Sequence, residues 1–140
     1  MADPRRSEGS GPAAAGRSGH GIRDGAFQTG LRRELLEILG PEGLLDDAAA
    51  RRVYSRDASH LTLGLPCAVA LPADAFSLQR VIASCARHGF PVVCRGTGTG
   101  LSGGAVPPEG ALVMSSARLT RLDPVDGAAK LVHAGPGVLN

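Results

Sequence analysis

Residues 95–104 read Arg-Gly-Thr-Gly-Thr-Gly-Leu-Ser-Gly-Gly, and half of these ten residues are glycine. Glycine has no side chain and tolerates positive φ, so a run of glycines lets backbone N–H groups converge on one point. Converging N–H groups bind anions, phosphate above all. The hydroxyls of Thr97, Thr99 and Ser102 add donors, and Arg95 places a cation at the start of the stretch. We therefore interpret residues 95–104 as a phosphate-binding loop, called the glycine loop below.

Short apolar segments on either side of the glycine loop predict the strands that hold it. Residues 90–94 and 111–114 are predicted strands, and residues 67–71 form an earlier buried strand. A helix capped by Asp74 follows that earlier strand. Its predicted apolar face consists of Leu78, Val81, Ile82 and Cys85. The order strand, helix, strand with short links predicts a parallel βαβ unit.

The segments before this unit predict two helices. Leu31, Leu35, Ile38 and Leu39 are spaced to line one helix face, and Gly40 ends that helix. A second, shorter helix is predicted from Asp46 to Tyr54, with Asp46 or Asp47 as its cap. Residues 1–29 have almost no large aliphatic side chains, so we expect a disordered N-terminal tail there.

The segments after the glycine loop predict a hairpin. Residues 119–122 and 130–134 form its two arms, around a turn at Asp126-Gly127. A Gly135-Pro136-Gly137 turn follows, and residues 138–140 look like the start of another element. We therefore expect residues 30–140 to be the N-terminal part of an incomplete domain. Its fold class is α+β, with a small βαβ sheet followed by an antiparallel hairpin.

Three familiar motifs compete for the glycine loop. Gly98-x-Gly100-x-x-Gly103 matches the dinucleotide fingerprint, and Gly100-x-Ser102-x-Gly104 matches a hydrolase nucleophile elbow, which Asp123 or Asp126 with His133 would complete as a triad. Both motifs must open a helix, and Pro107-Pro108 opposes one. A P-loop needs a lysine after its last glycine, and the only lysine is Lys130. What remains is a phosphate cradle between strands, with no helix behind it.

Composition excludes several classes of protein. Hydrophobic residues make up 43% and charged residues 20% of the 140 residues, as expected for one folded domain. Aromatic residues are only 3%, and the net charge is +2, so we expect no nucleic-acid partner. No window reaches the roughly 18 apolar residues of a membrane span. The first 26 residues also lack the apolar stretch of a secretory signal.

The cysteines indicate a compartment. Cys67, Cys85 and Cys94 are odd in number and form no C-x-x-C pair. This pattern favours neither a disulfide framework nor a metal site. We therefore predict free thiols, no metal and a reducing cytoplasm.

The sequence around the glycine loop resembles a known family. Pro-Val-Val-x-Arg-Gly-x-Gly-Thr-Gly-Leu-Ser-Gly-Gly-Ala-x-Pro, residues 91–107, is similar to the FAD pyrophosphate loop of FAD-linked oxidases. The resemblance points to the FAD-binding subunit of glycolate oxidase and related D-lactate dehydrogenases, in the vanillyl-alcohol oxidase and p-cresol methylhydroxylase superfamily. Tyr54-x-x-Asp57-x-Ser59, residues 66–72 and residues 134–140 also resemble family segments. In total the resemblance covers about residues 31–140.

The resemblance implies how a cofactor would be held. Backbone groups of the loop would bind the diphosphate of FAD, Arg95 would complement its charge or pair with an acidic neighbour, and the Gly135 turn would approach the cofactor. Members that bind flavin covalently tend to carry histidine where this chain has Thr99, so non-covalent FAD is implied. Tyr54 and Asp57 would be structural, Asp57 by a hydrogen bond to backbone. The implied cofactor-binding residues are Arg95, Gly96, Thr97, Gly98, Thr99, Gly100, Ser102, Gly103, Gly104, Gly135, Pro136 and Gly137.

The resemblance also implies a reaction. Relatives oxidise a 2-hydroxy acid of the glycolate or D-lactate type by hydride transfer to flavin N5, and the electrons pass to a quinone, a partner protein or oxygen. The substrate-orienting groups belong to the family's later cap region, so the catalytic residues are unknown here and the 140 residues alone are expected to be inactive. Two alternatives stay open, an NAD-dependent dehydrogenase using Gly98-x-Gly100-x-x-Gly103 and a non-catalytic nucleotide-binding fragment.

Overall fold

The computed structural model describes residues 27 to 139, so the predicted tail lies outside the described residues up to position 26. Phe27, which the sequence assigned to that tail, is buried, and its ring lies 5.9 Å from the ring of Phe90. The elements are, in chain order, the π-helix η1 (Phe27–Leu31), α2 (Arg32–Leu39), the 3-10 helix η2 (Pro41–Gly43), β1 (Leu44–Leu45), α3 (Ala48–Val53), β2 (Ala68–Ala70), α4 (Ala75–Arg87), β3 (Val92–Arg95) and β4 (Leu112–Ser115).

The strands form one mixed sheet in the order β1-β2-β4-β3. β4 is parallel to both of its neighbours, pairing Leu112 with Ala68 of β2 and with Val92 of β3, whereas β1 is antiparallel to β2. The predicted βαβ unit is therefore parallel, but its two strands are not neighbours, because β4 lies between them. β4 is buried along its whole length, while β3 is an edge strand and only half-buried.

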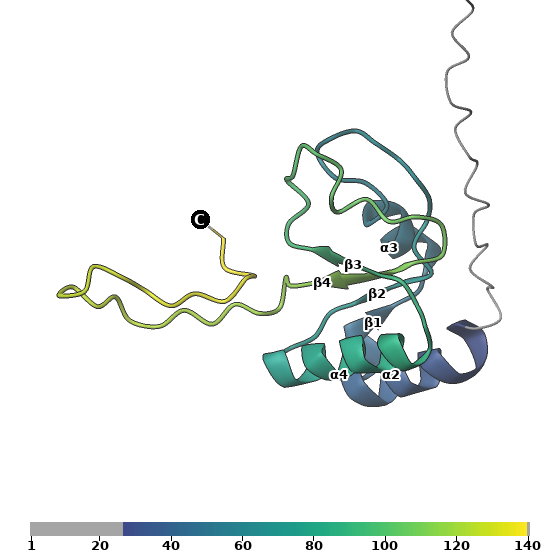
Figure 1. Ribbon diagram of the computed structural model, residues 1–140, viewed down its shortest axis with the longest axis horizontal. Helices are drawn as coiled ribbons and strands as arrows, with labels where there is room; N and C mark the ends of the chain where they lie inside the picture. Colours follow the sequence, from purple (N-terminus) through teal and green to yellow (C-terminus); the bar gives the residue numbers. More distant parts are fainter. Residues whose placement is uncertain (1–26, 140) are drawn as a thin grey trace, which may run out of the picture.

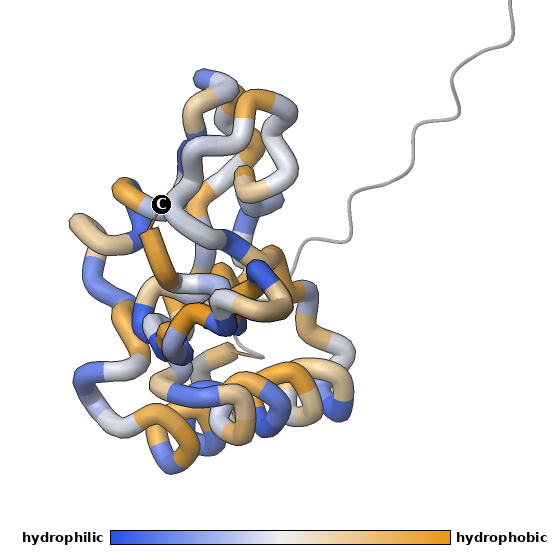
Figure 2. The backbone as a smooth tube through the Cα atoms, turned by 90° about the vertical axis from the view of Figure 1, so that its left-hand side faces the viewer, coloured by the Kyte–Doolittle hydropathy of each residue, from blue (hydrophilic) through white to orange (hydrophobic). Residues whose placement is uncertain are grey.

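Helices α2 and α4 cover one face of the sheet, and the 55–66 and 96–106 loops rise together on the opposite side (Figure 1). Hydrophobic and hydrophilic positions alternate along both helices (Figure 2), so each presents one apolar face to the sheet. The core between them is built from Phe27, Leu31, Leu35, Leu44, Ala68, Ala70, Val81, Cys85, Phe90, Leu112 and Met114. No helix in the described part of the chain is long and apolar enough to cross a membrane.

Acidic caps start two helices, as the sequence predicts. The Asp47 carboxylate accepts hydrogen bonds from the N–H groups of Ala49 and Ala50, both at 2.9 Å. Asp74 caps α4 through the N–H of Ser77 at 2.7 Å, and the Ser77 hydroxyl accepts from the N–H of Asp74 in return. The prediction that Ile82 belongs to the buried face of α4 is wrong, because its side chain is 44% exposed. Each cap satisfies backbone donors that a helix start leaves unpaired.

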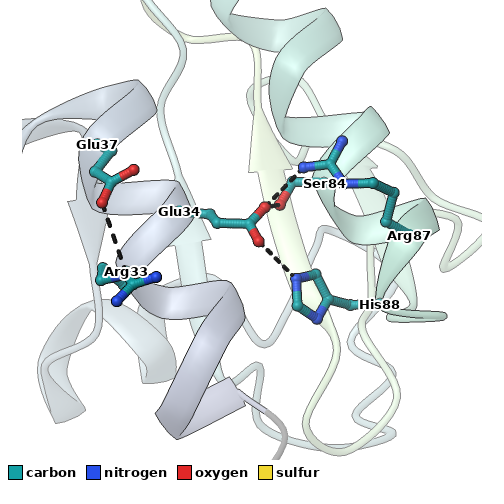
Figure 3. Close-up of polar contacts among 6 residues, drawn as sticks. All are labelled: Arg33, Glu34, Glu37, Ser84, Arg87 and His88. Carbon is teal, nitrogen blue, oxygen red and sulfur yellow. Dashed lines mark hydrogen bonds and ion pairs between the residues drawn. The ribbon is translucent and has the colours of Figure 1, made fainter.

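Glu34 joins α2 to α4 (Figure 3). Its carboxylate accepts hydrogen bonds from the Ser84 hydroxyl at 2.5 Å and from Arg87 at 2.7 Å, and it lies 3.0 Å from Nε2 of His88. These bonds, that from Ser84 first, then those from His88 and Arg87, lower the pKa of Glu34 to about 2. Glu37, one turn away, makes only an exposed ion pair with Arg33 at 3.7 Å.

Replacing Glu34 with glutamine should therefore lower stability at neutral pH but not in strong acid. A carboxyl group with a lowered folded-state pKa stabilises the fold above its usual pKa of 4.5, and that contribution is lost as the pH falls towards about 2. We expect the urea midpoints of wild type and Glu34→Gln to differ at pH 7 and to converge over that window. Glu37→Gln is the matched control and should follow wild type throughout. A constant difference between wild type and Glu34→Gln would contradict the prediction.

The predicted hairpin is present only as an extended loop with a few backbone pairings. Its two arms are joined by isolated bridges, Leu122 with Ala134 and Asp126 with Leu131, and neither arm is a regular strand. The Asp126 carboxylate accepts from the N–H groups of Ala128 and Ala129 and so forms the tip. In Figure 1 this segment projects away from the sheet. No helix or sheet among the described residues packs on this segment. It therefore lacks the buried apolar face that a regular two-stranded hairpin needs for stability.

Candidate functional site

The glycine loop leaves the end of β3 and reaches β4 without forming a helix. Pro107 is fully buried, and the N–H of Ala111 donates to the carbonyl of Pro108 at 3.2 Å, which makes a turn there. The dinucleotide fingerprint and the nucleophile elbow both need a helix after their last glycine. The NAD-dependent alternative is therefore wrong, because proline and a turn occupy the place of that helix.

The proposed hydrolase triad is not assembled either. Ser102 lines the cavity beside the glycine loop, whereas Asp123 and His133 line a separate recess of about 340 Å³ together with Arg121 and Gly135. Asp123 accepts a hydrogen bond from Arg121 at 2.8 Å. A nucleophile and its base must lie within hydrogen-bond reach, and these groups line different surfaces.

The glycine loop wraps a cavity of about 390 Å³. Seven predicted site residues line it, together with Asp57, Cys94, Leu101 and Ala105. Those seven are Gly96, Thr97, Gly98, Thr99, Gly100, Ser102 and Gly104. The hydroxyls of Thr97 and Thr99 lie 3.3 Å apart, so they form one polar edge. Cys94 was not predicted to line the site, although its place near the end of β3, directly before the loop, could have indicated it.

The backbone donors of this loop have no acceptor within the described residues. None of the nine N–H groups from residue 96 to residue 104 makes a hydrogen bond in the structure of residues 27–139. The first paired N–H after them is that of Ala105, which donates to Asp57 at 3.4 Å. Backbone N–H groups bind anions strongly when several meet at one concavity. All of these residues except Gly103 line the one cavity, so their free donors form a surface suited to an anion.

The loop glycines fall into two groups. Gly98 and Gly103 have φ values of +78° and +75°, and a Cβ on Gly98 would overlap the guanidinium of Arg95. The protein's own packing thus explains these two glycines. Gly96, Gly100 and Gly104 have no such φ, and a Cβ on any of them would meet nothing within 4 Å. Their missing side chains leave free space, as a ligand that approaches the backbone requires.

Arg95 lies at the start of the glycine loop but does not line its cavity. Its guanidinium stacks over the ring of Tyr54 at 5.2 Å and donates to the carbonyl of Arg56, and it does not line the cavity. No lysine or arginine lines that cavity in the described chain. Arg95 thus contacts residues 54–56 in this structure, and its role in complementing the phosphate charge stays a prediction.

Asp57 makes the backbone contacts that the sequence predicts. Its carboxylate accepts from the N–H and hydroxyl of Ser59, at 2.9 and 2.5 Å, and from the N–H of Ala105. The bonds from Ser59 are the main cause of its lowered pKa, with smaller contributions from Ala105 and the charge of Arg95. Asp57 is therefore ionised at neutral pH, and its acceptor positions are occupied by the protein itself.

The Gly135-Pro136-Gly137 turn lies beside the site but does not line the same cavity. Gly137 borders an apolar recess of about 490 Å³ that also touches Thr97, while Gly135 borders the recess of Asp123. The carbonyl of Pro136 accepts from the Ser116 hydroxyl at 3.1 Å. A Cβ on Gly135 or Gly137 would overlap the carbonyl of Leu119 or Ser116. Close backbone packing therefore accounts for both glycines without a ligand.

The structure is an α+β domain with an amide-lined cavity at its glycine loop. Residues 66–140 match the family model described as FAD binding domain. The chain belongs to this family of FAD-binding domains.

Known relatives agree with this assignment. The chain is 34% identical over 109 residues to glycolate oxidase subunit GlcD of Bacillus subtilis, covering 78% of this chain and 23% of that protein. It is 37% identical over 70 residues to D-lactate dehydrogenase of Archaeoglobus fulgidus, covering 50% of this chain and 16% of the relative. The fold matches p-cresol methylhydroxylase with substrate bound at a TM-score of 0.74 and 20% identity, over 84% of this chain and 24% of the other. The chain thus spans less than a quarter of the length of these relatives.

Proposed function

We propose that the glycine loop holds the diphosphate of a non-covalently bound FAD. The single observation that carries this proposal is the row of unpaired N–H groups, residues 96–104, of which all but Gly103 line one cavity. Each hydrogen bond to a charged group contributes about 1.5–3 kcal/mol net, so four or five of them would supply roughly 6–15 kcal/mol before binding costs. The loop needs no helix dipole and no cation to provide this.

The residues present fit the cofactor. Gly96, Gly100 and Gly104 open onto free space, so phosphate oxygens can approach the backbone. The paired hydroxyls of Thr97 and Thr99 supply further donors at the cavity edge. Thr99 has no ring nitrogen to attack a flavin, which supports non-covalent binding. Since no cationic side chain among residues 27–139 lines the cavity, recognition would rest on amide and hydroxyl donors.

We further propose that the protein is a flavin-dependent oxidoreductase acting on a 2-hydroxy acid of the glycolate or D-lactate type. The two curated relatives are named as a glycolate oxidase subunit and a D-lactate dehydrogenase, which supports this substrate class. When bound, FAD supplies the acceptor for the hydride of the hydroxyl-bearing carbon. The part played by this chain is to bind and orient the cofactor, and a quinone, a partner protein or oxygen would take the electrons.

The cysteines are free thiols, which supports the proposal of a reducing cytoplasm. Their alkylation also tests the proposed FAD site. Cys94 is exposed and lines the cavity, whereas burial raises the pKa of Cys67 to about 12 and that of Cys85 to about 11. Thiolates are the reactive form, so of these three Cys94 should be alkylated first. We expect saturating FAD to slow alkylation of Cys94 in the full-length protein at least tenfold, as measured by peptide mass mapping.

Two further arms make this test specific. Riboflavin at the same concentration should protect Cys94 far less, because it lacks the phosphates that the loop amides bind. Cys85 serves as an internal control, and its slow labelling should not change with either compound. Equal labelling of Cys94 with and without FAD would overturn the proposed site.

A further inference from the structure

A segment far from the glycine loop in sequence lies directly behind it. Residues 54–61 follow α3, and the N–H of Ala58 donates to the carbonyl of Gly98 at 3.0 Å. Further along the loop, the side chains of Ser59 and Leu61 pack against Gly103. The two segments rise side by side above the sheet in Figure 1. The loop is therefore contacted by residues 54–61 in a way that uses none of its own free N–H groups.

Arg95 connects these two segments near the start of the loop. Its guanidinium lies between the ring of Tyr54, at 5.2 Å, and the backbone of Gly98, and it donates to the carbonyl of Arg56. A planar guanidinium can stack on a ring and donate in its own plane at the same time, which an ammonium group cannot do. Arg95 thus holds Gly98 at a fixed distance from residues 54–56, where Ala58 can bond to it.

Asp57 makes the matching connection at the end of the loop. One carboxylate oxygen is held by Ser59, and the other accepts the N–H of Ala105. This arrangement places a negative charge beside a cavity that we expect to bind an anion. Arg95 offsets that charge, since its positive charge contributes to lowering the pKa of Asp57. The two side chains therefore act on opposite ends of the same loop and on each other.

We propose that Arg95 and Asp57 are positioning residues, which hold the glycine loop open for the diphosphate. Arg95 acts from outside the cavity, and Asp57 acts at the cavity wall through its bond to Ala105. A loop of nine residues with no hydrogen bonds between its own backbone groups would otherwise have to be ordered by its ligand, at the expense of affinity. The proposal rests on the proposed function for the identity of the ligand. The brace formed by residues 54–61 and Arg95 can nevertheless be measured with no cofactor present.

Amide hydrogen exchange, followed by NMR on the 140-residue chain without FAD, tests the brace. In Arg95→Ala we expect exchange at Ala58 and Ala105 to accelerate about tenfold or more, because both bonds depend on the position of the loop. In Asp57→Asn the Ala105 amide should lose protection while Ala58 keeps it. Arg118→Ala is the matched control, since Arg118 also donates to a backbone carbonyl, that of Glu42 at 3.5 Å, away from the loop.

Affinity for FAD in the full-length protein provides the second readout. We expect Arg95→Ala to bind FAD about tenfold more weakly, equivalent to about 1.4 kcal/mol, with an unfolding midpoint equal to that of Arg118→Ala. Arg95→Lys should fall between wild type and alanine, because it keeps the charge but loses the planar fork. Unchanged exchange in Arg95→Ala, unchanged FAD affinity, or a loss explained by a lower unfolding midpoint would each overturn the proposal. A wild type that fails to bind FAD would refute the proposed function, and the exchange pattern would still decide the brace.

Discussion

Replacing Gly100 with valine should release FAD from the full-length protein and leave the fold unchanged. The φ of Gly100 lies outside the left-handed region, and a Cβ there would meet nothing within 4 Å. A valine is therefore tolerated by the protein, but its methyl groups enter the cavity that the loop amides surround. Losing two hydrogen bonds to a charged diphosphate would cost about 3–6 kcal/mol, which weakens binding by about 100-fold or more. Flavin absorbance after gel filtration measures the loss.

The matched control is Gly127→Val in the projecting turn. Gly127 also has open space around it and an ordinary φ, but it does not line the cavity. We expect this variant to retain flavin like wild type. Gly98→Val is a weaker test, because its Cβ would overlap Arg95 and would disturb the loop even without a ligand. Wild-type flavin content in Gly100→Val would refute the diphosphate cradle.

Local chemistry made the helix starts and the helix-free loop predictable. Asp47 and Asp74 cap their helices through backbone groups within three residues, so the short sequence segment contains the whole interaction. The same holds for Pro107, which excludes a helix after the glycine loop through its own ring. Predictions of this kind depend on neighbours in the chain, and the structure confirms them.

Long-range contacts decided what the sequence could not predict. Nothing local places β4 between β2 and β3, because that order depends on which strand buries both faces. The two-residue strand β1 exists only through its pairing with β2. The sequence places Arg95 as a cation next to a phosphate-binding loop. Its contacts are with Tyr54 and Arg56, which lie about 40 residues away in the sequence. The loop that lines the candidate cavity was thus predictable from the sequence, whereas the contacts of Arg95 and residues 54–61 with that loop were not.

Shortening Leu112 to alanine should cause the largest loss of stability, because Leu112 supports the site from the centre of the sheet. It is fully buried in β4, where it pairs with Ala68 on one side and Val92 on the other. Such a truncation removes apolar contacts and leaves a cavity, at a cost of about 2–5 kcal/mol. The matched control is Leu63→Ala, whose side chain is 67% exposed, and it should change stability by less than about 0.5 kcal/mol. Urea unfolding measures both.

Added FAD should separate the core from the cofactor site in this variant. Leu112 does not line the cavity, so the affinity of the folded state for FAD should equal that of wild type. A ligand that binds only the folded state stabilises it by about 2.7 kcal/mol at a concentration 100 times its Kd. We therefore expect FAD to raise the free energy of unfolding by the same amount in wild type and Leu112→Ala, although the variant starts from a lower value. A smaller stabilisation by FAD in Leu112→Ala would contradict this and would mean that the packing of β4 affects the glycine loop through β3.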